Sequence, residues 1–273
     1  MKKIVHLSDI HFGSIDLDLV EPLVAAVKGL EPDVVAVSGD LTQRARSAQF
    51  IEARVFLDRM PKPLIVVPGN HDIPLYNIYR RFVDPLAKYR RYITDDLMPT
   101  CLDDEIAVFG INTARSLTVK GGRINEEQIA WLREKLCGLG NSIIKVIVTH
   151  HPFDLPAGSL ASDIVGRSAL AMQTLSDCGA DLFLAGHMHT IHTGHTSARY
   201  ETPNHSALVI QAGTAASTRH RGEANSFNLV RIDGTAITIE RHVWQPATLK
   251  FESASTEEFC REGAVWSPLH IAG

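Results

Sequence analysis

Short apolar runs that end abruptly in polar residues recur along this chain, and they constrain its fold more than any other feature. The runs read IVHLSDIH, VVAVSGD, LIVVPGNHD, IAVFGINT, IKVIVTHH, LFLAGHMH and ALVIQAGT. Near-continuous apolar strands indicate sheets that are covered on both faces. Apolar residues at helical spacing lie between them, as at residues 19–30 and in EEQIAWLREKL. This alternation predicts an α/β protein built in layers.

The pattern changes after Ala224. The runs NSFNLVRI and TAITIERHVW flank Asp233-Gly234, a dipeptide typical of two-residue turns, so we expect an antiparallel hairpin in a second, partly antiparallel sheet. From about Pro246 onward the sequence becomes irregular. We therefore expect residues 1–245 to form the main domain and residues 246–273 to form a tail packed on that domain or on a partner.

Composition and charge exclude several classes of protein. A length of 273 residues suits one large α/β domain or two small ones, with 45% apolar and 21% charged residues as in ordinary globular proteins. The formal net charge of −4 gives no positive field that would gather phosphate backbones, so we do not expect broad nucleic-acid binding. Association of identical copies stays open.

Membrane and secretion signals are not apparent in the sequence. No stretch approaches the roughly 20 apolar residues of a transmembrane segment, and the first residues reach His6 and Asp9 before a signal-peptide core develops. The four cysteines are scattered without a CxxC pair, at Cys101, Cys137, Cys178 and Cys260. This spacing favours reduced thiols over a disulfide framework, and we predict a cytoplasmic protein.

The polar residues that close the strands form one set of candidate ligands. Asp9 and His11 lie two residues apart and can point the same way, and His187 and His189 repeat that spacing. Ligands in open α/β sheets gather outside the carboxyl ends of the strands. The set contains four histidines, two aspartates and one asparagine: Asp9, His11, Asp40, Asn70, His150, His187 and His189.

The chemistry of this set indicates a metal centre. Imidazoles and side-chain oxygens without a thiolate suit divalent ions such as Mn, Fe, Co, Ni or Zn. Seven side chains exceed what one ion needs, whereas two ions sharing a carboxylate would use all of them. Two ions roughly 3.5–4 Å apart form a known clamp for in-line displacement at phosphorus. Gly39, Gly69 and Gly186 each precede a candidate ligand, where the backbone must turn sharply or pack closely.

Five motifs carry a resemblance to a known family. DIH at 9–11, GD at 39–40, GNHD at 69–72, HHP at 150–152 and GHMH at 186–189 resemble, in the same order, the five blocks of calcineurin-like metallophosphoesterases. The resemblance covers residue 4 to about residue 230. It implies a four-layer αββα sandwich with two mixed β-sheets, the metallo-dependent phosphatase fold, with residues 1–245 as the catalytic domain.

The resemblance also implies a role for each ligand. Asp9, His11 and His189 would bind one divalent ion. Asn70, His150 and His187 would bind the other, and Asp40 would bridge the two. His71 matches a histidine of the family that contacts the phosphate without binding metal. We predict that His71 is catalytic, either as the acid that protonates the leaving oxygen or as a group that stabilises phosphate charge.

Several further residues keep two interpretations. His151 and Asn112 are candidate substrate contacts beside Asn70 and His71. A structural histidine is an equally good interpretation of His151, which is also the alternative to His150 as a ligand, although the family pattern favours His150. For Asn112 we favour a turn residue. Asp72 could orient a neighbour or cap a turn. The arginines of the segment IPLYNIYRRFVDPLAKYRRYI could meet phosphate or form a solvated helix face: Arg80, Arg81, Arg90 and Arg91.

These features together predict a metal-dependent phosphoesterase with two divalent metal ions as cofactors and a small phosphate ester as its partner. The expected reaction is in-line attack on phosphorus by a hydroxide that the two ions share. The chain is most similar in build to bacterial class III cyclic-nucleotide and glycerophosphodiester phosphodiesterases, so we favour a diester. The alternatives are a phosphomonoesterase, a pyrophosphohydrolase of a nucleotide-linked lipid, and a non-enzymatic scaffold of the same fold, which should lack some ligands.

Overall fold

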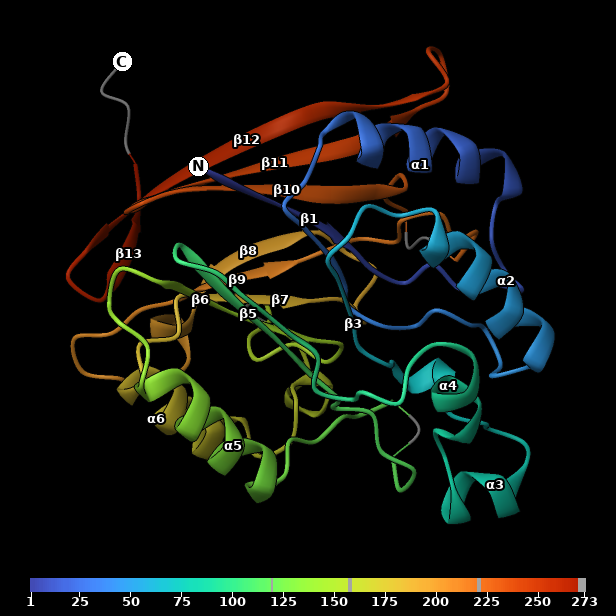
Figure 1. Cartoon of the computed structure of the whole chain (residues 1–273), viewed down its shortest axis with the longest axis horizontal. Coiled ribbons are helices and arrows are strands. Elements are labelled where there is room, and N and C mark those ends of the chain that lie inside the picture. The colour runs from blue at the N-terminus through green and yellow to red at the C-terminus, as the bar shows by residue number, and fades with distance from the viewer. Residues whose placement is uncertain (119, 157–158, 220–221, 270–273) are drawn as a thin grey trace.

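Two β-sheets lie face to face at the centre of the molecule, and helices cover the outer face of each (Figure 1). The structure, a computed structural model, describes residues 1–118, 120–156, 159–219 and 222–269. Within these residues the first sheet has the strand order β13-β12-β11-β10-β1-β2-β3, and the second has the order β4-β5-β6-β7-β9-β8.

The first sheet combines parallel and antiparallel strands. Strands β1, β2 and β3 are parallel, and β10 to β13 continue the sheet in antiparallel fashion from the other edge of β1. The bounds are β1 (Lys2–Leu7), β2 (Val34–Val37), β3 (Leu64–Val66), β10 (Ser226–Asp233), β11 (Ala236–Gln245), β12 (Lys250–Glu262) and β13 (Val265–Pro268).

The second sheet is parallel in its centre, from β5 through β6 and β7 to β9, with antiparallel strands at both edges. The bounds are β4 (Thr100–Leu102), β5 (Ile106–Ile111), β6 (Ile144–Thr149), β7 (Leu182–Ala185), β8 (His192–His195) and β9 (Leu208–Gln211). The helices are α1 (Val20–Gly29), α2 (Ser47–Asp58), α3 (Ile78–Val83), α4 (Ala87–Tyr92), α5 (Glu126–Cys137) and α6 (Ser168–Asp177).

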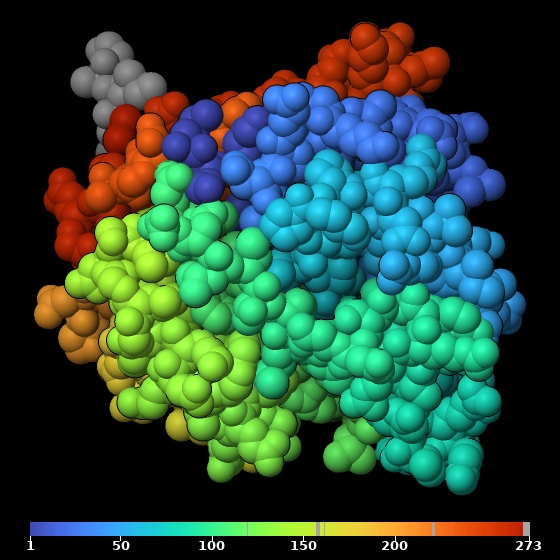
Figure 2. All heavy atoms as spheres, viewed as in Figure 1, coloured from blue at the N-terminus to red at the C-terminus, as the bar shows by residue number. Residues whose placement is uncertain are grey.

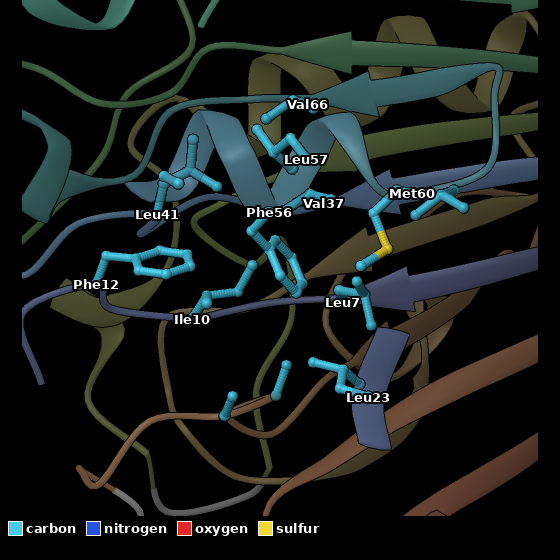
Figure 3. Packing of buried hydrophobic residues seen from close by; sticks show 14 of the residues in the cluster. Leu7, Ile10, Phe12, Leu23, Val37, Leu41, Phe56, Leu57, Met60 and Val66 are labelled. Atoms are coloured by element: carbon cyan, nitrogen blue, oxygen red, sulfur yellow. The ribbon is translucent and has the colours of Figure 1, made fainter. Parts of the chain in front are cut away.

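Three buried clusters show that the molecule has four layers. Ile4, Val108 and Val146 belong to the cluster shared by the two sheets. A second cluster joins the first sheet to α1 and α2, and Figure 3 shows Leu23 and Phe56 packed over Leu7 there. The third joins the second sheet to α5 and α6. The predicted αββα sandwich is therefore confirmed, and Figure 2 shows α1 and α2 covering the upper part of this face, with α5 below.

The C-terminal strands correct three details of the sequence analysis. The predicted hairpin exists, but its loop is Gly234-Thr235 rather than Asp233-Gly234. It extends the sheet that contains β1 and forms no separate sheet, because β10 pairs with β1. The segment after Pro246, expected to be irregular, contains β12 and β13, and Phe259 and Trp266 are buried between the sheets. Residues 270–273 of the predicted tail lie outside the described residues.

The prediction of four reduced cysteines is wrong, because Cys137 and Cys178 form a disulfide. Cys137 ends α5 and Cys178 follows α6, and the packing of these helices brings the two Cα atoms within 4.4 Å. Cys101 and Cys260 are free. The cysteine argument for a reducing compartment therefore no longer holds. Among the described residues, no helix has both the length and the apolar character needed to span a bilayer.

Candidate metal centre

The predicted ligands lie at the carboxyl ends of five strands, three in the first sheet and two in the second. Asp9 and His11 follow β1, Asp40 follows β2, and Asn70 begins a short 3-10 helix (Asn70–Asp72) just after β3. His150 follows β6, and His187 and His189 follow β7. The two stacked sheets thus present their ligands to one space between the loops.

Several of these side chains are carried by residues with a left-handed backbone conformation. Asp9, His11, Asp40, His187 and His189 have positive φ angles of 52°, 56°, 53°, 74° and 58°. This left-handed conformation is uncommon for residues other than glycine and costs about 1–3 kcal/mol for each. Its recurrence at five ligand positions means that the surrounding structure holds the chain in sharp turns where the strands stop.

Glycines allow the loops to approach one another. A Cβ on Gly69 would lie 2.1 Å from Oδ1 of Asp40, and one on Gly186 would lie 1.8 Å from Oγ of Ser8. Both distances are far below van der Waals contact. A larger residue at either position would therefore push a neighbouring side chain, Asp40 or Ser8, out of the centre.

The first ligand group consists of Asp9, His11, Asp40 and His189, whose ligand atoms lie within 4.8 Å of one another. Oδ1 of Asp9 lies 3.6 Å from Nε2 of His11 and 3.2 Å from Nε2 of His189. This oxygen is buried and accepts no hydrogen bond of acceptable geometry. A buried carboxylate oxygen that faces two imidazole nitrogens without a hydrogen bond fits a site for a cation.

The second group forms around Asn70. Its Oδ1 lies 3.0 Å from Nε2 of His150 and 3.1 Å from Nδ1 of His187. Asp40 lies between the groups, since its Oδ2 is 3.7 Å from Nε2 of His11 and its Oδ1 is 3.4 Å from Nε2 of His150. One carboxylate thus faces both groups, as a bridging ligand must.

Electrostatics keep the ligands in forms that bind metal. Burial by itself raises the pKa of Asp9, but the nearby imidazoles of His11 and His189 outweigh it and hold that pKa well below its usual range. Burial, aided by neighbouring His150, lowers the pKa of His187 to about 4. Asp9 is therefore ionised and His187 neutral at pH 7, the forms in which they ligate. The donor set fits two divalent cations without selecting one element.

His71 adjoins the centre without belonging to either group. Its backbone N–H donates to Oδ1 of Asp40 at 2.8 Å, and its Nδ1 lies 2.9 Å from the carbonyl oxygen of Gln43. Nδ1 therefore carries the proton in the neutral ring. Nε2 is then an acceptor, and Nη1 of Arg219 lies 3.1 Å from it. Burial lowers the pKa of His71, although the charge of Asp40 opposes this.

Two of the predicted substrate contacts have internal partners. Both ring nitrogens of His151 are engaged, Nδ1 with Oγ1 of Thr113 at 2.8 Å and Nε2 with the carbonyl oxygen of Lys120 at 2.9 Å. Its side chain is fully buried, so this geometry favours the structural interpretation, even though His151 lies beside His150 and His187. Asn112 is also buried, and its Oδ1 accepts from the N–H of Ala114 within a turn.

Sequence reasoning missed or left open several residues that position the centre. Asp72 accepts hydrogen bonds from the N–H groups of Leu41, Thr42 and Gly69, so it fastens the loop after β2 to the loop after β3. Burial and the charge of Asp40 nevertheless raise the pKa of Asp72 to about 6. The role of Arg219 was missed, since it lies in the irregular segment STRHRGEANSF, where spacing carries no signal.

Comparison with known proteins agrees with this geometry. The family described as calcineurin-like phosphoesterase matches residues 2–190. The glycerophosphodiester phosphodiesterase GpdQ of Enterobacter lignolyticus is 27% identical over 210 residues, which cover 69% of this chain and 71% of that protein. A cAMP/cGMP dual specificity phosphodiesterase of Mycobacterium tuberculosis is 26% identical over 264 residues, covering 84% of this chain and 75% of that protein.

A solved structure shares the fold at low sequence identity. The purple acid phosphatase PPD1 from yellow lupin superposes with a TM-score of 0.69 at 11% identity, covering 96% of this chain and 54% of that longer one. The predicted fold and family are both confirmed. The chain is a metal-dependent phosphoester hydrolase that belongs to the calcineurin-like phosphoesterase family.

Proposed function

We propose that this protein hydrolyses small phosphodiesters at a pair of divalent ions. The observation that carries the proposal is the position of Asp40, whose two oxygens face two separate ligand groups while its Oδ1 also accepts from the N–H of His71. The relatives named as phosphodiesterases support the choice of a diester.

In this proposal the ligands divide as the family resemblance implies. Asp9, His11 and His189 would hold one ion. Asn70, His150 and His187 would hold the other, and Asp40 would contact both. Such ions, when bound, lower the pKa of water and neutralise charge on phosphate. We choose His150 over its neighbour His151 as the ligand because hydrogen bonds occupy both ring nitrogens of His151.

His71 is the proposed catalytic acid. The bond from Nδ1 to Gln43 fixes the ring and directs Nε2 toward Arg219. While Nε2 accepts from that guanidinium, it carries no proton to donate. Donation to a leaving oxygen therefore requires that the substrate phosphate attract Arg219 away and that the ring take up a proton, which a neighbouring phosphate charge favours.

Metal analysis and turnover test this function together. Purified full-length protein loaded with Mn should bind about two ions per chain and hydrolyse bis(p-nitrophenyl) phosphate faster than p-nitrophenyl phosphate. Asp40→Asn should lower metal affinity by more than roughly 10–100-fold, the loss typical of mutating a residue that only hydrogen-bonds to a metal ligand. The exposed Asp95→Asn should leave both properties unchanged.

The outcomes separate the alternatives. Faster monoester turnover would favour a phosphomonoesterase, and turnover restricted to nucleotide-linked pyrophosphates would favour a pyrophosphohydrolase. A protein that stays free of metal and inactive after Mn loading would contradict the proposal and favour a scaffold. A cytoplasmic location and the oligomeric state stay predictions that cell fractionation and sedimentation would test.

A further inference from the structure

A cationic cavity opens beside the candidate metal centre. It has a volume of about 200 Å³ and is bordered by Asn70 and His71 on the side of the metal ligands. Four cationic side chains line it as well: Arg44, Arg81, Lys120 and Arg219. Among the described residues the lining contains no carboxylate. Since a water occupies about 30 Å³ of liquid, the cavity has room for a phosphate group.

Arg81 gives this cavity a buried positive charge. Its side chain is 6% exposed, and its guanidinium donates to the carbonyl oxygens of Pro74 at 3.2 Å and Thr118 at 2.5 Å. Neither partner carries a negative charge, and burial lowers the pKa of Arg81. A buried guanidinium without a carboxylate partner is costly, so the arrangement favours an anionic ligand.

The other three cations come from separate loops that converge on the same space. Nη1 of Arg219 lies 3.3 Å from Oε1 of Gln43 and 3.1 Å from Nε2 of His71. The guanidinium of Arg44 lies 5.3 Å from the ring centre of Tyr76. The backbone of Lys120 is held by His151. Within the described part of the chain none of the three pairs with a carboxylate, so all of them add to the positive field.

The amount of charge exceeds what the reacting group requires. A phosphodiester carries one negative charge, which a pair of divalent ions, His71 and Arg219 would already meet. Three further cations beside that site, Arg44, Arg81 and Lys120, favour a ligand with more negative charge, and the planar guanidinium matches phosphate oxygens in a bidentate manner. We propose that the cavity binds a second phosphate, a phosphomonoester carried by the substrate beyond the ester that reacts. This inference rests on the proposed phosphodiester hydrolysis and narrows its substrate class.

A matched pair of chromogenic substrates tests the inference. Thymidine 5′-(p-nitrophenyl phosphate) and its 3′-phosphorylated derivative share the reacting ester and the leaving group, and they differ by one phosphomonoester. We expect Mn-loaded protein to show a kcat/KM about tenfold or more higher for the 3′-phosphorylated substrate. Equal values for the two substrates would overturn the inference and leave phosphodiester hydrolysis intact.

Variants locate the effect in the cavity. Lys120→Gln changes an exposed side chain, so folding should be preserved, and the ratio of the two kcat/KM values should fall roughly tenfold. Arg80→Gln is the matched control, because Arg80 is exposed on the same helix as Arg81 and does not line the cavity. An equal fall in both variants would indicate general attraction by surface charge and contradict a specific site.

Binding separates this inference from the proposed reaction. Titration calorimetry with the Mn-loaded full chain should give about tenfold or more tighter binding of thymidine 3′,5′-bisphosphate than of thymidine 5′-monophosphate, with the difference lost in Lys120→Gln. This measurement needs no turnover. If neither chromogenic substrate is hydrolysed while the binding difference persists, the proposed reaction fails and the second phosphate site stands. If both nucleotides bind equally, the site is absent.

Discussion

At the scale of single residues, the proposed role of His71 as the catalytic acid depends on its contact with Arg219. The ring is held through Nδ1, and its Nε2 faces the guanidinium of Arg219. A histidine in this position is poised to act after substrate arrives rather than before. Its contribution should therefore depend on how much the leaving group needs a proton.

We predict that His71→Ala will reduce hydrolysis of a diester with an alkyl leaving group by roughly 10²–10⁴-fold. The same variant should change hydrolysis of bis(p-nitrophenyl) phosphate far less, because nitrophenolate leaves without protonation. Steady-state kcat for both substrates measures this difference. Equal losses on the two substrates would show that His71 stabilises phosphate charge and is not the acid.

A second residue, His6, predicts a pH dependence of stability. It lies within β1 with its Nε2 2.9 Å from Oγ of Ser38, and burial lowers its pKa from 6.5 to about 3. The unfolded chain therefore takes up a proton as pH falls below 6.5, whereas the folded chain does not until about pH 3. The contribution of His6 to the free energy of unfolding is therefore complete above pH 6.5. Below that pH it is lost by about 1.4 kcal/mol per pH unit.

Urea unfolding at two pH values measures this contribution. Between pH 7 and pH 5 the free energy of unfolding of the wild type should fall by about 2 kcal/mol more than that of His6→Gln, which does not titrate. Other groups contribute equally to both proteins and cancel in the comparison. Equal falls would mean that His6 is already charged in the folded protein.

At the scale of elements, the left-handed turns after the strands are the feature that builds the centre. Glycine adopts such φ angles freely, whereas alanine pays a steric cost. Metal-free His189→Gly should therefore be more stable than His189→Ala by about 0.5–1 kcal/mol, as measured by chemical denaturation. Ala53→Gly in α2 is the control with the opposite sign, because glycine destabilises a helix interior by about 1 kcal/mol. If alanine were more stable than glycine at both position 189 and position 53, the backbone at His189 would not be strained.

The elements also explain what the sequence could reveal. The candidate ligands were predictable because each follows an apolar strand within a few residues, so local order in the chain encodes their position. Strand β12 was not predictable, since Phe251 and Phe259 are its buried residues and the stretch between them shows no alternation. Arg81 could not be distinguished from Arg80 because α3 has six residues, too few to establish a buried face. Cys137 and Cys178 are 41 residues apart and meet only when α5 packs against α6.

At the scale of the whole molecule, Asp181 joins the two sheets. It precedes β7 of the second sheet and accepts from Nε1 of Trp266 at 2.9 Å and from Nη1 of Arg261 at 2.7 Å, both from the first sheet. Asp181→Ala should destabilise the protein by about 3–5 kcal/mol, because it leaves a partly buried guanidinium and a buried indole N–H without their partner. The midpoint of thermal unfolding measures this, with the exposed Asp95→Ala as control. A shift no larger than that of the control would show that the sheets are held by apolar packing alone.

The pairing of β1 with β10 has a consequence for the order in which the molecule can assemble. Strand β1 lies in the interior of its sheet, between β2 and β10, yet β10 begins only at Ser226, far later in the chain. During translation, the backbone N–H and C=O groups on that edge of β1 cannot pair with β10 until residues 226–233 have been synthesised. Nascent chains that stop before β10 would expose an unpaired strand edge on β1. We expect such truncated products to aggregate or to bind chaperones.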